Sequence, residues 1–134
     1  MTDIFREKRM PAIERPLAGE SLLFHLPTEL DATSNAEILA RSGRTARTLI
    51  KDDSLRVSIH VLAPGGSIAE HHANGPITVQ VLQGALSFTA GDREYDLHVG
   101  DVLALDTAVR HSVHSKDGGA FLLTVSLPDS GTAA

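Results

Sequence analysis

Paired histidines, His71 and His72, are the residues of this chain whose types and spacing most clearly suggest chemistry. A glycine-rich turn that starts at Pro64 precedes them, and a second turn, Asn74-Gly75-Pro76, follows them. Imidazole is the side chain whose ordinary pKa lies nearest neutral pH, and it is the commonest metal ligand in proteins. The pair therefore indicates a site for a small ligand or a metal ion.

A strand directly after the second turn must position these imidazoles. Residues 77–82 read Ile-Thr-Val-Gln-Val-Leu, a run that is apolar and β-branched enough to predict a buried strand. Imidazoles beside the start of such a strand lie where a β-barrel holds a small ligand or a metal ion. The candidate site is therefore expected at the mouth of a barrel.

Short predicted strands, separated by turn residues, fill the chain after Gly43. They span residues 45–50, 55–63, 77–83, 85–90, 94–99, 102–105, 111–115 and 120–127. In the second of them, every other residue from Leu55 to Val61 is apolar, which predicts one buried face. Many short strands at regular spacing describe an all-β fold, a closed antiparallel sandwich or barrel of jelly-roll type.

The first part of the chain is predicted to hold an arm, a strand and one short helix. Residues 1–20 contain prolines in polar sequence and show neither a helical nor a strand period, which is typical of an arm. Residues 21–26 predict a short strand that a proline ends. Residues 35–42 predict a helix, with Ser34 as its N-terminal cap and a glycine after its last turn.

The length of 134 residues predicts one domain. We expect the barrel domain to cover residues 21–128, preceded by the arm and followed by a small-residue tail, 129–134. Because the core must be built with only 4% aromatic residues, it is expected to consist of Val, Leu, Ile and Ala. Such aliphatic, β-branched cores suit small barrels.

Composition excludes several kinds of site and partner. The chain has no cysteine, so a metal must be held by His, Asp, Glu or Gln. The net charge of -5 argues against nucleic acid or an anionic membrane as the main partner, because phosphate binding needs clustered positive charge. No apolar run is long enough for a signal peptide or a membrane span, so a cytoplasmic location is expected.

Two groups of residues have the spacing of known motifs. In the first group, Gly65 lies six residues before His71, and Ala73, Ile77 and Gly84 follow. This spacing resembles the first motif of the cupin superfamily, which has a glycine, two histidines, a glutamate and a closing glycine. The resemblance implies that Ala73 and Ile77 stand where two metal ligands are usual.

The second group resembles the second cupin motif. Gly100 opens it, Asp106 and Ala108 replace its proline and glycine, and Ser115 replaces its asparagine. His111 falls on the histidine of that motif. Both motifs together are moderately specific for the fold and weakly specific for function, because the superfamily includes many kinds of enzyme and binding protein.

From about residue 62 to 127 the chain resembles small single-domain bacterial cupins of unassigned role. The resemblance implies a cupin-like double-stranded β-helix (jelly-roll) barrel. It also implies a metal held by three imidazoles and a carboxylate, a set that suits Fe, Mn, Ni, Zn or Co. His71 and His111 match two of those four positions, and in such a barrel they converge from facing strands.

His72 and Glu70 are the candidates to complete a metal shell. In an extended strand, Glu70 and His72 share one face and His71 points to the other. All three point inward only if the loop bulges. Since two protein ligands hold a divalent metal weakly, binding depends on recruiting one of these side chains.

The alternative is a metal-free pocket in which His71 and His111 are only hydrogen-bonding residues. Isoleucine at position 77 cannot coordinate a metal and makes the pocket more apolar. On the inner face that the resemblance implies, Ile77, Val79 and Val81 line this pocket, and the neighbouring glutamine at position 80 faces the opposite side.

The other histidines and two arginines are assigned structural roles. His25, His60 and His98 lie on predicted strands and are interpreted as hydrogen-bonded polar residues. Arg44 precedes the first barrel strand and Arg47 lies in it, and a surface ion pair is favoured for them over binding of a substrate carboxylate.

Three functions follow from these observations. The first is a divalent-metal-dependent enzyme of the oxygenase or isomerase type, and the second is a metal-free barrel that binds or senses a small-molecule ligand. The third is a structural dimer whose pocket has no function. A homodimer is expected from the resemblance and from the predicted edge strand 21–26, which can pair with a second copy.

Overall fold

A computed structural model of the protein describes residues 16–127. Most of the predicted arm (1–20) and the whole predicted tail (129–134) therefore lie outside the described residues. Two helices precede the strands: α2 (Leu26–Thr33) and α3 (Ala36–Ser42). The strands are β1 (Arg44–Lys51), β2 (Leu55–Leu62), β3 (Ser67–His71), β4 (Ile77–Ala90), β5 (Arg93–His98), β6 (Val102–Leu105), β7 (His111–His114) and β8 (Gly119–Ser126). No helix in this part of the chain is long and apolar enough to cross a membrane.

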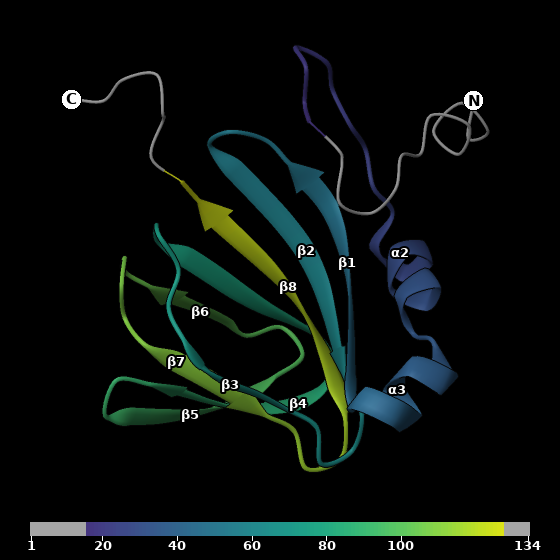
Figure 1. The fold of residues 1–134 in the computed structure, drawn as a ribbon, viewed down its shortest axis with the longest axis vertical. Helices are drawn as coiled ribbons and strands as arrows, with labels where there is room; N and C mark the ends of the chain where they lie inside the picture. The colour runs from purple at the N-terminus through teal and green to yellow at the C-terminus, as the bar shows by residue number, and fades with distance from the viewer. Residues whose placement is uncertain (1–15, 128–134) are drawn as a thin grey trace.

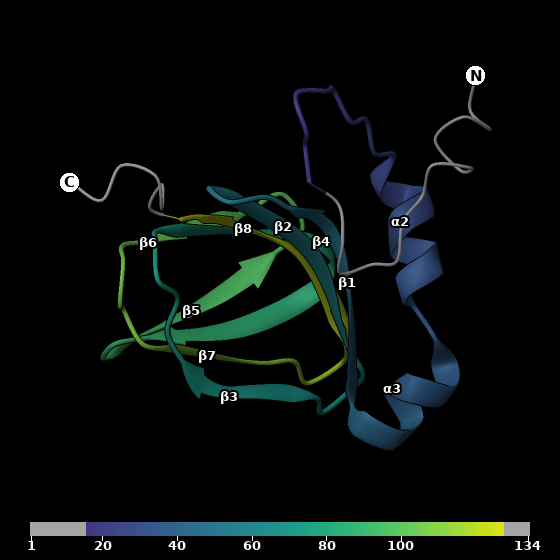
Figure 2. The same ribbon diagram turned by 45° about the horizontal axis from the view of Figure 1, so that its top comes forward.

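The strands form an antiparallel sheet that curls into two facing layers (Figures 1 and 2). One layer has the order β1-β2-β8-β4 with β6 on the far side of β4, and the other contains β3, β7, β4 and β5. The strand β4 belongs to both, because residues 77–84 pair with β8 and residues 85–90 pair with β5 and β7. This arrangement confirms the predicted jelly-roll barrel.

Gly84 is the residue at which β4 passes from one layer to the other. Its φ of 69° lies in the left-handed region, and a Cβ atom built on it would lie 2.3 Å from the carbonyl oxygen of Gly118. Only glycine accepts both conditions without strain. The two predicted strands 77–83 and 85–90 are therefore one bent strand, with the predicted turn glycine at the bend.

The prediction of a strand at residues 21–26 and of a single helix was wrong. Residues 21–25 have no regular structure, and α2 begins at Leu26. Pro27 lies in the first turn of α2, where a missing N–H group costs no intrahelical hydrogen bond. The proline that was interpreted as the end of a strand is thus compatible with the start of a helix.

The second helix is close to its predicted bounds. Its cap is Asn35, whose side chain accepts a hydrogen bond from the backbone N–H of Ile38 at 3.1 Å. The predicted cap, Ser34, instead donates its hydroxyl hydrogen to the carbonyl oxygen of Leu30 in α2 at 2.9 Å. Gly43 ends the helix in the left-handed conformation, as predicted.

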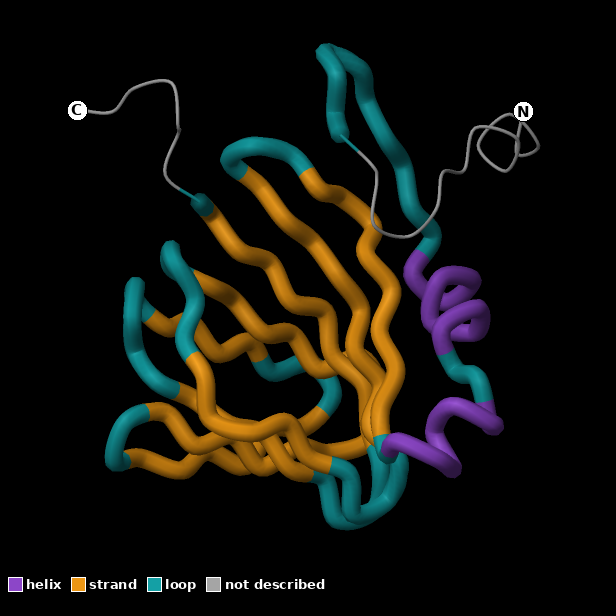
Figure 3. The backbone as a smooth tube through the Cα atoms, in the orientation of Figure 1, coloured by secondary structure: helices purple, strands orange, loops and turns teal. Residues whose placement is uncertain are grey.

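Both helices cover the outer face of the layer that contains β1 and β2 (Figure 3). An apolar cluster joins Leu49, Ile59 and Val61 of that layer to Leu30 and Leu39 of the helices. The alternating apolar residues of β2 therefore face the helices. Consequently the opposite face of β2 turns toward the barrel interior, where the sequence pattern predicted no buried surface.

A second apolar cluster fills the space between the two layers. It contains Leu62, Ile77, Val79, Val81, Leu86, Phe88, Leu97, Val113 and Phe121, all of them buried. An ion pair fixes α2 to β1 on the outside, since the Arg47 Nε atom donates to the Glu29 carboxylate at 3.0 Å. The barrel is thus closed by apolar packing inside and by the helices on one outer face.

Candidate functional site

The structure brings His71 and His111 together. His71 is the last residue of β3, His111 is the first residue of β7, and the two are direct partners in the antiparallel pairing of these strands. Their ring centroids lie 4.3 Å apart with an interplanar angle of 65°. His71 is exposed, whereas only 4% of His111 is exposed. The sequence pattern did not predict β3, although the turn before it was recognised.

Backbone carbonyl groups orient both imidazoles in the same way. The Nδ1 atom of His71 lies 2.8 Å from the carbonyl oxygen of Ala69, and that of His111 lies 2.9 Å from the carbonyl oxygen of Val109. Because a carbonyl oxygen can only accept, each Nδ1 must carry the hydrogen. In the neutral rings, Nε2 is then the acceptor, available to a hydrogen-bond donor or a cation.

The pKa of His111 is lowered from its ordinary value. Burial lowers its pKa and is the largest influence, the hydrogen bond to the Val109 carbonyl opposes this shift, and positive charge on His71 and His72 lowers the pKa further. A neutral imidazole can accept a hydrogen bond at Nε2, which an imidazolium cannot do.

Glu70 and His72 are not brought into the same arrangement. Glu70 is exposed, and its carboxylate accepts a hydrogen bond from Arg110 Nε at 3.0 Å on the other face of β3. His72 lies just beyond the end of β3, is exposed, and does not line the cavity described below. Neither side chain is therefore placed beside the two imidazoles.

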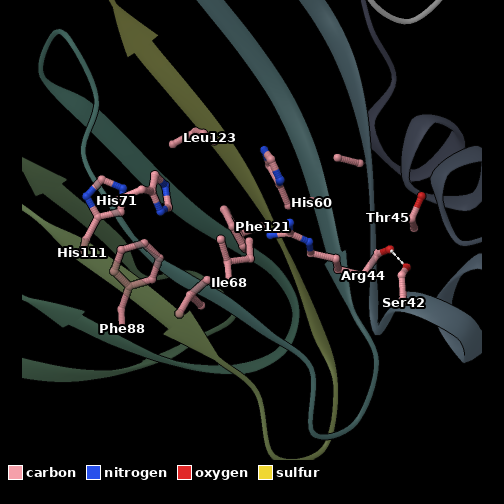
Figure 4. A pocket seen from close by; sticks show the side chains of 12 residues that line it. Ser42, Arg44, Thr45, His60, Ile68, His71, Phe88, His111, Phe121 and Leu123 are labelled. Carbon is pink, nitrogen blue, oxygen red and sulfur yellow. Dashed lines mark hydrogen bonds between the residues drawn. The ribbon is translucent and has the colours of Figure 1, made fainter.

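A cavity of about 450 Å³ opens between the two layers beside His71 and His111 (Figure 4). Its wall combines apolar side chains with a small number of polar ones. The lining residues are Ser42, Arg44, Thr45, Ala46, His60, Ile68, His71, Phe88, His111, Val113, Phe121 and Leu123. This size and mixture are typical of sites that bind small molecules.

Ile77, Val79 and Val81, the residues predicted to line the pocket, lie in the core instead of on the cavity wall. Their side chains are buried, with 3%, 0% and 1% exposure, on the inner face of β4. They pack in the same cluster as Phe88 and Phe121, which do line the cavity. Gln80 is exposed on the opposite face, as strand parity predicts.

His60 is a cavity residue that the sequence did not reveal. Its ring stacks on Phe121 with centroids 5.0 Å apart, and its Nε2 atom lies 2.9 Å from the hydroxyl oxygen of Ser58. Burial, and then the positive charges of Arg44 and His71, lower its pKa to about 4. The alternation in β2 was the available signal, because it separates His60 from the aliphatic face, but it does not specify which face turns into the barrel.

Arg44 and Arg47 have different roles, although both were interpreted as surface ion-pair residues. Arg47 makes the ion pair with Glu29. Arg44 lines the cavity, and Figure 4 shows its side chain extending toward His60 and Phe121. Side chains of β1 point in alternate directions, so Arg44, which is exposed, faces the cavity and Arg47 faces α2.

The donor set does not fit the metal shell that the cupin resemblance implies. Among residues 16–127, no group of three or more His, Asp or Glu side chains is placed to hold a metal ion. Two imidazoles, His71 and His111, are adjacent, while the positions of the other two usual ligands hold Ala73 and Ile77. The described residues thus supply half of the usual ligand set.

Three solved structures illustrate the fold likeness. A cupin superfamily protein from Desulfitobacterium hafniense is 20% identical with a TM-score of 0.63, over 90% of this chain and 99% of that chain. A protein of unknown function from Streptococcus pyogenes is 22% identical, with a TM-score of 0.63, over 67% and 79%. Salicylate 1,2-dioxygenase from Pseudoaminobacter salicylatoxidans, in complex with gentisate, is 17% identical with a TM-score of 0.68, over 77% of this chain and 32% of that chain.

Because the three structures are at most 22% identical to this chain, the likeness shows a shared fold. No curated protein matches the chain. The cupin domain family model matches residues 58–126, from the middle of β2 to the end of β8, which is more than half of the chain. On the match to that family and the shared fold, the chain belongs to the cupin superfamily.

Proposed function

We propose that the protein binds a small molecule in the cavity between its two layers, without a metal ion. The observation that supports this function is the wall of the cavity, where polar groups from four strands converge on one apolar space of about 450 Å³. Those polar groups are Arg44, His60, His71 and His111. Binding sites combine apolar area for affinity with a few polar groups for orientation, and this cavity has both.

The apolar and the polar side chains of the cavity wall have different roles in this proposal. The apolar side chains of Phe88, Phe121 and Val113 exclude water and contact the body of the ligand. The Nε2 atoms of His71 and His111 accept hydrogen bonds, because their Nδ1 hydrogens are already donated to carbonyl oxygens.

A thermal-shift screen of a fragment library against chelator-treated protein tests this function. A ligand that binds only the native state raises the unfolding temperature. We expect such shifts in the natural protein and their loss in Ala46→Trp, which places an indole in the cavity. Ala40→Trp, on the exposed surface of α3, is the control and should keep them.

If no fragment stabilises the natural protein, or if Ala46→Trp responds as the natural protein does, the proposed function is wrong. The first of these outcomes favours a structural dimer whose pocket has no function. Both tryptophan variants are first compared without ligand, so that a change in folding is separated from a change in binding.

A divalent-metal-dependent enzyme of the oxygenase or isomerase type is the second candidate. It is favoured by one observation, the hydrogen bonds that leave Nε2 of both His71 and His111 as the acceptor atom. The solved structure of a dioxygenase with the same fold is consistent with it. Completion of the shell would need His72, Glu70 or a ligand atom, and Glu70 would first have to leave Arg110.

Elemental analysis of untagged protein, supplied in turn with Fe, Mn, Ni, Zn and Co, tests the second candidate. It predicts stoichiometric metal in the natural protein and its loss in both His71→Ala and His111→Ala. His98→Ala changes an exposed histidine outside the cavity and should retain the metal. Absence of stoichiometric metal under every supplement would reject this candidate.

A further inference from the structure

The cavity has two polar ends that differ in charge. At one end His71 and His111 come from β3 and β7, and at the other end Arg44 and His60 come from β1 and β2 (Figure 4). Apolar and aromatic side chains, including Phe121, lie between the two ends. A ligand that fills the cavity therefore meets a guanidinium and an imidazole at one end and two imidazoles at the other.

The positive charge of Arg44 is not neutralised within the described part of the chain. Its guanidinium makes no hydrogen bond or ion pair with any of residues 16–127, and no aspartate or glutamate is among the residues that line the cavity. Two glutamates on neighbouring elements pair with other arginines, Glu29 with Arg47 and Glu70 with Arg110. An arginine that faces an acid-free cavity favours an anionic ligand.

The surroundings of Arg44 support the same conclusion. The positive charge of Arg44 is close enough to His60 to help lower the pKa of that imidazole, and burial contributes more. His60 is therefore neutral near pH 7 and does not add a second charge. One guanidinium, with its fork of parallel N–H donors, can hold a single carboxylate through two hydrogen bonds.

We propose that Arg44 binds the carboxylate of a small organic acid whose apolar body lies against Phe88 and Phe121. This assignment deepens the proposed binding function and rests on it. The ring of Phe121 already stacks on His60, and that of Phe88 stacks on His111 at 5.7 Å, so aromatic faces extend toward both polar ends. A flat monocarboxylate of about the size of benzoate can contact these faces while its charge is at Arg44.

Benzoate and benzamide are suitable probes, because they have nearly the same shape and only benzoate is charged. Their dissociation constants are measured by titration calorimetry or by NMR shifts, at low salt, in chelator-treated protein. A charge-assisted hydrogen bond changes affinity by about tenfold or more, so benzoate should bind the natural protein at least about tenfold more tightly than benzamide.

Two variants test whether Arg44 causes the preference for benzoate over benzamide. Arg44→Gln should lose this preference, binding benzoate about tenfold more weakly and benzamide as the natural protein does. Arg93→Gln removes an exposed arginine of β5 that does not line the cavity, and it should leave both constants unchanged. Equal binding of the two probes by the natural protein, or undiminished benzoate binding by Arg44→Gln, overturns the assignment.

The Ala46→Trp variant separates this failure from failure of the proposed function. If benzamide and benzoate bind equally and both are lost in Ala46→Trp, the cavity binds small molecules but does not select a carboxylate. If probe binding persists unchanged in Ala46→Trp, both the cavity function and the role of Arg44 are wrong.

Discussion

A histidine inside the cavity makes the stability of the protein depend on pH. The pKa of His60 is lowered from 6.5 to about 4 in the folded state, because burial and the charge of Arg44 disfavour the imidazolium. As the pH falls below 6.5, the unfolded chain takes up a proton at this position before the folded protein does. The contribution of neutral His60 is therefore present above pH 6.5 and is lost as the pH falls to about 4.

We predict that His60→Gln has a smaller loss of unfolding free energy than the natural protein between pH 7 and pH 4. The lowered pKa of His60 corresponds to a difference in unfolding free energy of at most about 3 kcal/mol. Urea unfolding at several pH values measures the unfolding free energy of both proteins. The difference between the two pH dependences isolates the effect of His60 from that of the other histidines. Parallel curves for the two proteins would contradict the prediction.

At the scale of single elements, the bend in β4 is the feature that gives the barrel its two layers. Gly84 has a φ of 69° and lies against the backbone of Gly118, whereas Gly91 has a φ of 62° with open space around it. Both positions disfavour a side chain through their backbone conformation, and only Gly84 adds a steric conflict.

We predict that Gly84→Ala destabilises the protein more than Gly91→Ala does. The backbone effect alone costs about 1–2 kcal/mol at either site. At Gly84 the clash with Gly118 must also be relieved by moving β4 away from β8. Chemical denaturation of the two variants tests this difference, and equal losses of unfolding free energy would show that the bend tolerates a Cβ atom.

The ion pair that attaches α2 to β1 is more buried than the other ion pair of the described residues. The pairs Arg47–Glu29 and Arg110–Glu70 have the same length, 3.0 Å, but the side chains are 18% and 6% exposed in the first pair and 58% and 57% exposed in the second. Burial strengthens a charged hydrogen bond, because water and salt screen it less.

Replacement of each arginine by glutamine should therefore have unequal effects. Arg47→Gln is predicted to lower the unfolding free energy by about 1.5–3 kcal/mol. For Arg110→Gln the loss should be below about 1 kcal/mol, as is usual for exposed ion pairs. Denaturant unfolding of both variants in one buffer measures the difference. A larger loss for Arg110→Gln would mean that burial does not govern these pairs.

At the scale of the whole molecule, the homodimer stays a prediction that rests on the cupin resemblance. The strand at residues 21–26 that was expected to pair with a second copy is not formed. Within the described residues, β1 is an edge strand, since it pairs with β2 on one side only. An unpaired edge of this kind is a surface on which two copies can associate.

Size-exclusion chromatography with light scattering at micromolar concentration tests the prediction, and a mass near twice 14.2 kDa is the expected result. A single monomeric species across the concentration range would reject the homodimer.

Much of the barrel could be predicted from the sequence, because its strands and turns carry local signals. Strand β6 has its predicted bounds, and most other strands differ from prediction by one or two residues. Two elements had no such signal. The turn and paired histidines obscured β3, and Pro27 was taken to end a strand when it lies in the first turn of α2.

The candidate site was predictable in part, because motif spacing is also a signal carried by the sequence. The spacing of the cupin motifs singled out His71 and His111, and the structure places these two rings together. The other polar residues of the cavity wall, Arg44 and His60, were predicted to have structural roles, because a strand pattern specifies two faces without specifying which of them turns inward.

The sequence by itself determined the all-β barrel, the turn positions and the two histidines, since periodicity, glycine chemistry and motif spacing are properties of the chain. Only the tertiary structure decided the wall of the cavity. Because α2 and α3 bury the aliphatic face of β2, the opposite face, with His60, must turn into the barrel. Packing of helices that lie earlier in the chain thus selects the residues that a ligand meets.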